Sequence, residues 1–117
     1  MEWNRNKFRW VEETDFKSVA HKCATDETYI VRAVSVWHDD LLCGYLITCD
    51  SFGIRSFHGF KFVTGGLEFQ MPMTRKYIEE EKLEYSMFHT NKTKAVLRIL
   101  GFKEVYSKDG HTLSRKI

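Results

Sequence analysis

The feature that most constrains the fold is a run of β-branched and aromatic residues, Tyr29 to Trp37 (YIVRAVSVW). Such side chains pack well on a pleated, half-buried surface, so the run predicts a strand. A polar turn at 38–40 separates it from a second apolar run, Leu41 to Cys49 (LLCGYLITC). Together the two runs predict an antiparallel hairpin. The segment Ile54 to Val63 then alternates between apolar and polar residues and predicts a third strand of the same meander.

Weaker signals on either side complete the expected order of elements. Phe8 to Glu12 alternates like a short strand, and Thr14 and Asp15 offer oxygens that cap a helix over 15–23. After the meander we expect a strand at Leu67 to Met71, a helix over Thr74 to Lys82 entered through Pro72, a strand at Leu83 to Thr90, a helix over Asn91 to Leu100, and a closing hairpin of Phe102 to Ser107 with Thr112 to Ile117. This order predicts the α/β (α+β) class, with a single mixed, mostly antiparallel sheet and helices on its faces.

Length and charge exclude several classes of protein. A chain of 117 residues with 43% apolar side chains suits one domain with its own core. A formal net charge of +2 is well short of the concentrated positive charge of a nucleic-acid-binding domain. The apolar runs are too short to cross a bilayer, and the start, MEWNRNKFRW, lacks the apolar core of a secretory signal. We therefore expect a small cytoplasmic protein.

The cysteines, Cys23, Cys43 and Cys49, are odd in number and widely spaced. Small secreted domains more often carry an even set at close spacing, so we expect reduced thiols. No second pair of ligands accompanies His21 and Cys23 at the spacing of a zinc finger. The sequence therefore predicts neither a disulfide nor a metal site.

Several short motifs occur in an order that resembles the GNAT (N-acetyltransferase) superfamily. The opening FRWVEETDF is similar to the family's first strand, followed by a helix that begins at Asp. Phe69, Met71, Pro72 and Arg75 fit part of its pyrophosphate-loop segment, apolar-x-apolar-x-Pro-x-x-Arg-x-x-Gly-x-Gly. AVLRILGFKEV is similar to its closing helix, which ends in Gly-Phe before a hairpin. The resemblance covers nearly the whole chain and implies one GNAT-like domain over 1–117, most similar to short GNAT-like proteins of tailed phages, including the internal virion protein of T7-like phages.

This resemblance implies transfer of an acetyl group from acetyl-CoA to an amine. In the family, backbone N–H groups at a helix N-terminus bind the cofactor's pyrophosphate. Ile78 and Glu80 stand where the loop pattern has glycines, so the loop is degenerate. The implied cofactor contacts are Thr74, Arg75 and Lys76 at the pyrophosphate, Gln70 and Met71 beside the pantetheine arm, and Asn91 near the family's usual asparagine.

Acyl transfer to an amine also needs a group that takes the amine proton and an acid for the leaving thiolate. The resemblance implies Glu68 as a strand-borne base and His89 as a second proton carrier near a strand end. The family's usual acid is a tyrosine, and its position here is Leu97, which has no proton to give. Tyr85, on the preceding expected strand, is the candidate replacement.

Two other classes of function stay open. A catalytically inactive GNAT-fold binding protein, acting as a virion component or an inhibitor of a host protein, fits the glycine-poor loop and the missing acid. It would occur in the host cytoplasm or in the virion. A nucleic-acid contact is the more distant hypothesis, and it depends on aromatic and basic residues that interleave near the N-terminus: Trp3, Arg5, Lys7, Phe8, Arg9 and Trp10.

Overall fold

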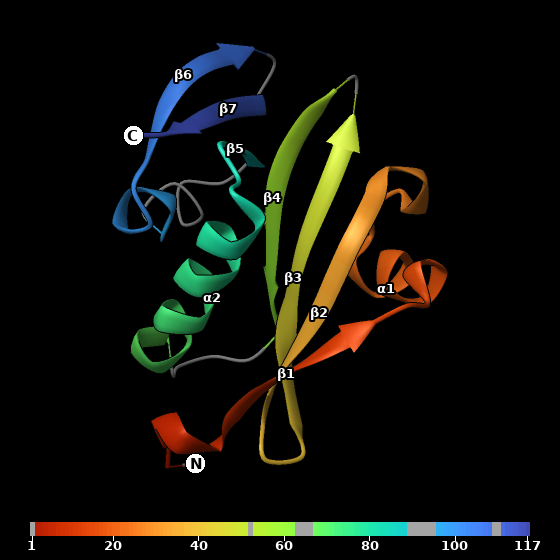
Figure 1. Cartoon of the computed structure of the whole chain (residues 1–117), viewed down its shortest axis with the longest axis vertical. Coiled ribbons are helices and arrows are strands. Elements are labelled where there is room, and N and C mark those ends of the chain that lie inside the picture. The colour runs from red at the N-terminus through yellow and green to blue at the C-terminus, as the bar shows by residue number, and fades with distance from the viewer. Residues whose placement is uncertain (1, 52, 63–66, 89–95, 109–110) are drawn as a thin grey trace.

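The computed structural model describes residues 2–51, 53–62, 67–88, 96–108 and 111–117 (Figure 1). Seven strands form one sheet in the order β1-β2-β3-β4-β5-β7-β6. They are β1 Phe8–Glu13, β2 Ile30–His38, β3 Leu41–Ser51, β4 Ile54–Lys61, β5 Tyr85–Phe88, β6 Phe102–Lys108 and β7 His111–Lys116. In the described residues, the helices with full bounds are α1 Phe16–Cys23 and α2 Leu67–Glu81, residues 96–99 are also helical, and short 3-10 turns lie at Arg5–Lys7 and Glu27–Tyr29. Every neighbouring strand pair is antiparallel except β4 and β5.

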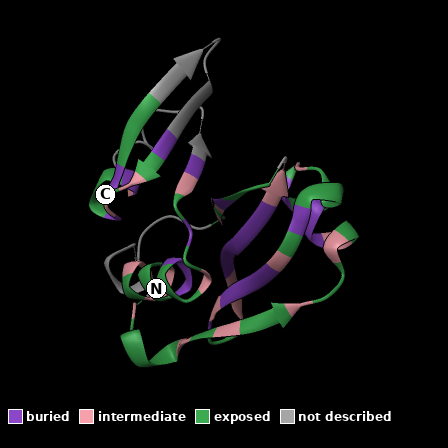
Figure 2. Ribbon diagram, turned by 45° about the horizontal axis from the view of Figure 1, so that its top comes forward, coloured by how far each residue is buried: buried purple, intermediate pink, exposed green. Residues whose placement is uncertain are grey.

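The two helices cover opposite faces of the sheet, because the strands of the meander are apolar on both faces. One register pair, Ala33 and Ile47, belongs to the core cluster that α1 covers with Val19, Ala20 and Cys23. The adjacent pair, Val34 and Leu46, belongs to the cluster that α2 covers with Tyr77 and Ile78. Neighbouring residues of a strand point to opposite faces, so this alternation buries β2 and β3 on both sides (Figure 2). The expected fold class is confirmed.

The local signals for the first half of the chain are also confirmed. The carboxylate of Asp15 accepts a hydrogen bond of 3.1 Å from the backbone N–H of Ser18 and so caps α1. Ala24, with φ of 51°, ends the helix in the left-handed conformation. The meander 30–61 and the closing hairpin of β6 and β7 lie where the sequence places them. Among the described residues, no helix is long and apolar enough to cross a bilayer.

The expected strand at Leu67 to Met71 is wrong. These residues form the first part of α2, which therefore begins well before Pro72 and contains it. Leu67, Met71 and Ile78 are spaced by four and seven positions, and this helical period places Met71 and Ile78 against the same core cluster. Pro72 is the sixth residue of α2, so its nitrogen donates no hydrogen bond within the helix and its ring crowds the backbone carbonyl four positions earlier. Of the expected helix Asn91 to Leu100, residues 96–99 are helical, and 91–95 lie outside the described residues.

Candidate functional site

A gap in strand pairing inside the sheet marks the candidate site. β4 and β5 run parallel and share two register positions, Ser56↔Tyr85 and Phe57↔Ser86. Beyond these positions β4 continues to Lys61 and β5 to Phe88, and the described backbone of 58–61 is no longer paired with that of 87–88. We call this gap, between 58–61 of β4 and 87–88 of β5, the β4–β5 opening. Unpaired backbone groups within a sheet require another hydrogen-bonding partner.

A side chain closes the sheet at the inner end of the opening. Ser86 Oγ donates a hydrogen bond of 2.8 Å to the carbonyl oxygen of Phe57, and both residues are buried. The ring of Phe57 lies over Gly59, where an added Cβ would be only 2.9 Å from the ring atom Cζ. Gly59 lies two positions after Phe57, the last residue of β4 that pairs with β5, and so on the same face of the sheet. A larger residue at this position would collide with the Phe57 ring.

The other face of the same strands carries polar groups. Ser56 and His58 are two positions apart on β4, so their side chains lie on one side of the sheet. Ser56 Oγ and His58 Nε2 are 3.0 Å apart. Tyr85 is the register partner of Ser56 across the parallel pair, which places it beside this pair at the inner end of the opening. The sequence analysis did not select Ser56 or His58, although Ser-x-His within an alternating strand already places both on one face.

The expected pyrophosphate residues are not gathered at a helix start. Thr74, Arg75 and Lys76 lie in the middle of α2, because the helix begins at Leu67. Arg75 Nη2 donates a hydrogen bond of 2.9 Å to the carbonyl oxygen of Ile99, at the end of the helical segment 96–99. Lys76 Nζ lies 5.6 Å from the centre of the Trp10 ring on β1. The two cations therefore point to different parts of the molecule.

The remaining expected site residues fall in several places. Met71 packs against the core, and Tyr85 lies on β5 as expected. Glu68 and Gln70 belong to the first turn of α2, so the strand placement on which their roles were based is wrong. Their side chains, together with all of His89 and Asn91, lie outside the described residues.

The start of α2 lies at the same end of the sheet as the outer end of β4 (Figure 1). In the sequence, Gly65 and Gly66 directly precede Leu67. The first four N–H groups of a helix have no partner within the helix.

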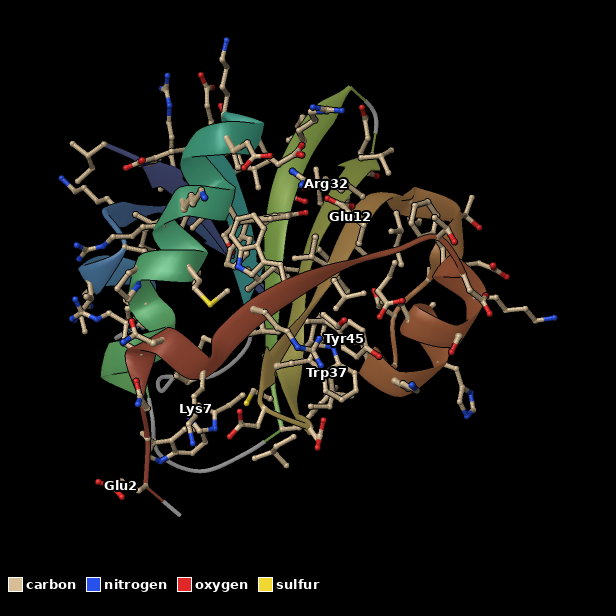
Figure 3. All side chains as sticks on the ribbon, turned by 60° about the horizontal axis from the view of Figure 1, so that its bottom comes forward. Glu2, Lys7, Glu12, Arg32, Trp37 and Tyr45 are labelled. Atoms are coloured by element: carbon tan, nitrogen blue, oxygen red, sulfur yellow. The ribbon has the colours of Figure 1, made fainter. Side chains whose placement is uncertain are left out.

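The other end of α2 carries a network of charges around Arg32 of β2. The Arg32 guanidinium binds Glu12 of β1 as well as Glu80 and Glu81 in the last turn of α2, and its side chain is 21% exposed. Figure 3 shows Arg32 and Glu12 pointing toward one another. These hydrogen bonds, first of all that to Glu12, raise the pKa of Arg32 above its usual value. Arg32 therefore joins β1, β2 and α2 and offsets two carboxylates at the negative end of a helix dipole.

The aromatic residues near the N-terminus are partly buried and pack against the core. The ring centres of Trp3 and Phe8 lie 5.0 and 4.8 Å from that of His38. Trp10 packs edge-on against Tyr77 of α2, at 5.9 Å. This arrangement weakens the nucleic-acid hypothesis, because these faces already pack within the protein.

Two hollows lie at this N-terminal end, away from the β4–β5 opening. One, of about 320 Å³, is lined by Glu2, Trp3, Asn4, Arg5 and Lys7. The other, of about 420 Å³, is lined by Glu2, Lys7 and the turn 38–41. Neither is lined by a residue of the opening. Within the described part of the chain, no group of His, Cys, Asp and Glu side chains could hold a metal ion.

No protein-family model and no curated protein matches the sequence. Solved structures match the fold over nearly the whole chain. An N-acetyltransferase of Campylobacter jejuni aligns with a TM-score of 0.63 and 12% identity, over 93% of this chain and 96% of that one. A GNAT family acetyltransferase of Elizabethkingia anophelis, with acetyl-CoA bound, aligns with a TM-score of 0.63 and 8% identity, over 95% and 98%. The chain has the GNAT acetyltransferase fold.

A third match extends the likeness to acyltransferases more broadly. An acyl-CoA N-acyltransferase of Pseudomonas aeruginosa aligns with a TM-score of 0.60 and 17% identity, over 94% of this chain and 99% of that one. Identities this low establish the fold, and an activity has to be argued from the site.

Proposed function

We propose that the chain is an N-acyltransferase that moves an acetyl group from acetyl-CoA to an amine. The observation that carries this proposal is the β4–β5 opening, where two parallel strands inside one sheet pair at two positions only. The unpaired backbone fits an elongated ligand with amide groups of its own. The pantetheine arm of CoA has this chemistry, and a protein with this fold carries acetyl-CoA.

The helix after β4 suits the anionic end of the same ligand. Free N–H groups and the helix dipole favour a phosphate at the start of a helix. In our proposal the backbone of 67–70 holds the pyrophosphate, so Gln70 keeps a cofactor contact through its backbone. Arg75 and Lys76 support α2 from its middle, through Ile99 and Trp10.

The polar residues at the inner end of the opening suit the proton transfers. Acetyl-CoA, when bound, supplies the acyl group as a thioester. His58 takes the proton that the acceptor amine loses, since imidazole is a base near neutral pH. Ser56 holds the His58 ring in one orientation through the contact at Nε2. Tyr85, beside Ser56 in the register, donates a proton to the leaving thiolate.

The test is release of the CoA thiol from acetyl-CoA in the presence of a panel of amines. His58→Ala should lower kcat about a hundredfold or more, the usual size of a general-base effect, with acetyl-CoA affinity unchanged. The exposed His21 of α1 provides the matched control, and His21→Ala should leave the rate unchanged. Equal rates for the two variants would contradict the role of His58. The absence of amine-dependent thiol release by the unchanged protein would contradict the activity.

Finer expectations from the sequence stay predictions. They include a phage origin, a virion or host-protein partner, a cytoplasmic location and a catalytically inactive binding role. Roles for His89, for Asn91 and for Glu68 as a base also stay predictions, the last without its expected strand placement.

A further inference from the structure

β1 forms one edge of the sheet, and its outer side is unpaired in the described part of the structure. Figure 3 shows β1 running across the front of the other strands. Val11, at its middle, is 38% exposed. An edge strand with unpaired backbone groups is a surface on which another strand can pair. The partner that suits this edge can be argued from its backbone and its charges.

One hydrogen bond tells which residues of β1 point their backbone outward. The backbone N–H of Asp39 donates a bond of 3.1 Å to the carbonyl oxygen of Lys7, directly before the first register pair, Phe8↔His38. In an antiparallel ladder, hydrogen-bonded positions alternate with positions that are not bonded. The backbone N–H and C=O groups of the odd-numbered residues of β1 therefore form hydrogen bonds with β2. The outward N–H and C=O groups belong to Phe8, Trp10 and Glu12.

A second copy of β1 can pair with this edge in the antiparallel direction. Its residues with outward N–H and C=O groups must then stand opposite the residues of the first copy whose backbone groups also point outward. Such registers are centred on Arg9, Trp10, Val11 or Glu12. Centring on Arg9 or on Glu12 opposes like charges, since each of these residues then faces itself. Centring on Trp10 places Arg9 opposite Val11 of the partner subunit, without a charge pair.

The register centred on Val11 is complementary throughout. Trp10 then forms the hydrogen-bonded pair with Glu12 of the partner subunit. Arg9 stands opposite Glu13 of the partner subunit, and the two-fold axis repeats both pairs. Val11 meets Val11 of the partner subunit at a non-bonded position, where side chains lie closest. In this register, every outward backbone N–H and C=O group from Trp10 to Glu12 has a hydrogen-bonding partner in the other copy.

The charged side chains are already held on the side of the sheet that this pairing needs. The Arg9 guanidinium lies 5.3 Å from the centre of the Trp37 ring. Glu13 Oε1 accepts a hydrogen bond of 2.8 Å from Ser35 Oγ. Trp37 and Ser35 are the register partners of Arg9 and Val11 on β2, so all these groups lie on one face. Little side-chain order has to be created when the two edges meet.

We propose that two copies of the chain pair through β1 in the register centred on Val11, joining two seven-stranded sheets into one. Strands β2 and β3 separate this interface from β4, so the β4–β5 opening stays accessible in both copies. The proposal does not depend on acyltransferase activity.

A disulfide across the two-fold axis tests the register directly. Val11→Cys places two thiols opposite each other at a non-bonded antiparallel pair, where a disulfide can form. Under mild oxidation this variant should become a covalent dimer that a reductant reverses, because the native cysteines are buried. Val105→Cys, 53% exposed on the opposite edge strand β6, is the control and should form no covalent dimer. A Val11→Cys variant that forms no disulfide-linked dimer, or equal cross-linking of both variants, would overturn the proposal.

Charge reversal provides an independent measurement by sedimentation equilibrium. The unchanged chain should sediment as a dimer of 13.9 kDa protomers in reversible equilibrium. Arg9→Glu and Glu13→Arg should each weaken dimerisation at least tenfold, and the double variant should recover most of the loss. Circular dichroism confirms that each variant is folded. A chain that stays monomeric at millimolar concentration, or a double variant no better than the single ones, would contradict the pairing.

Discussion

Ser86 donates its side-chain hydrogen bond to the carbonyl oxygen of Phe57 at the last position where β4 and β5 pair. This side-chain hydrogen bond takes the place of a backbone hydrogen bond between β4 and β5 at the point where the two strands separate. It holds the inner end of the β4–β5 opening at a fixed place in the sheet. The hydroxyl of one buried serine thus lies at the place where the unpaired backbone begins.

Removing this bond should destabilise the fold. Ser86→Ala leaves the Phe57 carbonyl without its side-chain donor in a buried position, and such losses cost about 1 to 3 kcal/mol. Urea unfolding measures the effect. Ser18→Ala, on the half-exposed side of α1, is the matched serine control and should change the free energy of unfolding by less than about 0.5 kcal/mol. Equal stability of the two variants would show that the Phe57 carbonyl does not need the hydroxyl.

A methyl group at Gly59 should disturb the same place by steric conflict. The added Cβ meets the Phe57 ring at 2.9 Å, and this ring is only 4% exposed. Gly59→Ala should lower the free energy of unfolding by about 1 to 3 kcal/mol, as overpacking does. The smaller side chain of Phe57→Leu should reduce the cost of Gly59→Ala when the two are combined. Strictly additive effects in this double-mutant cycle would contradict the contact.

Tyr77 should make the protein sensitive to alkaline pH. Burial is the main cause that raises its pKa to about 12, while a hydrogen bond of 2.6 Å to Thr48 acts in the opposite direction. The unfolded chain releases the phenol proton near pH 10. Between about pH 10 and 12 the folded state therefore binds more protons, and stability falls by at most about 1.4 kcal/mol per pH unit.

Comparison with Tyr77→Phe isolates this contribution. At neutral pH this variant should be less stable, because the buried Thr48 hydroxyl loses its partner, at a cost of about 1 to 3 kcal/mol. From pH 9 to 11.5, its stability should fall less steeply than that of the unchanged protein. Cys23 and Cys49 are common to both chains, so their raised pKa values, about 11 each, affect the two profiles alike. Parallel profiles would contradict the assignment.

Loss of Arg32 should destabilise the sheet more than loss of an exposed ion pair. Arg32→Ala removes the guanidinium that binds Glu80 and Glu81 at the carboxyl end of α2, where negative charge is unfavourable. Glu81 then keeps only its longer contact, of 3.8 Å, to the half-exposed Arg55. We expect a loss of about 1 to 3 kcal/mol in urea unfolding, and only partial rescue by Arg32→Lys, which lacks the planar fork. Lys7→Ala breaks an ion pair to Asp39 in which both side chains are at least half exposed, and should cost under about 1 kcal/mol. A larger effect at Lys7 than at Arg32 would contradict this ranking.

The sequence predicts those parts of the fold where local pattern and packing agree. The run Tyr29 to Trp37 is β-branched and aromatic, and nearly all of it forms β2, a largely buried inner strand of the sheet. Asp15 and Ser18 form the capping contact expected at the start of α1. The order of the elements was sufficient to indicate the GNAT fold before any distance was known.

The secondary-structure prediction failed at one short segment whose apolar residues fit both the two-residue period of a strand and the 3.6-residue period of a helix. Leu67 to Met71 alternates like a strand, but with Ile78 it also fits a helix, and the longer period is the correct one. Pro72 reinforced the error, since proline usually marks a helix start. Because of that error, the cofactor contacts expected from the sequence lie almost two helical turns after the backbone of 67–70 that we propose for the pyrophosphate. Ser56 and His58 were missed because their closeness to Tyr85 depends on the pairing of β4 with β5, which no local pattern encodes.

The measurement that tests the central claim most directly is a calorimetric titration of the purified protein with acetyl-CoA and with CoA. If the β4–β5 opening and the start of α2 hold the cofactor, both ligands should bind with micromolar dissociation constants and a stoichiometry of one per chain. Gly59→Ala, which displaces the Phe57 ring beside the opening, should weaken both. No heat of binding at millimolar acetyl-CoA would contradict the proposed acyltransferase.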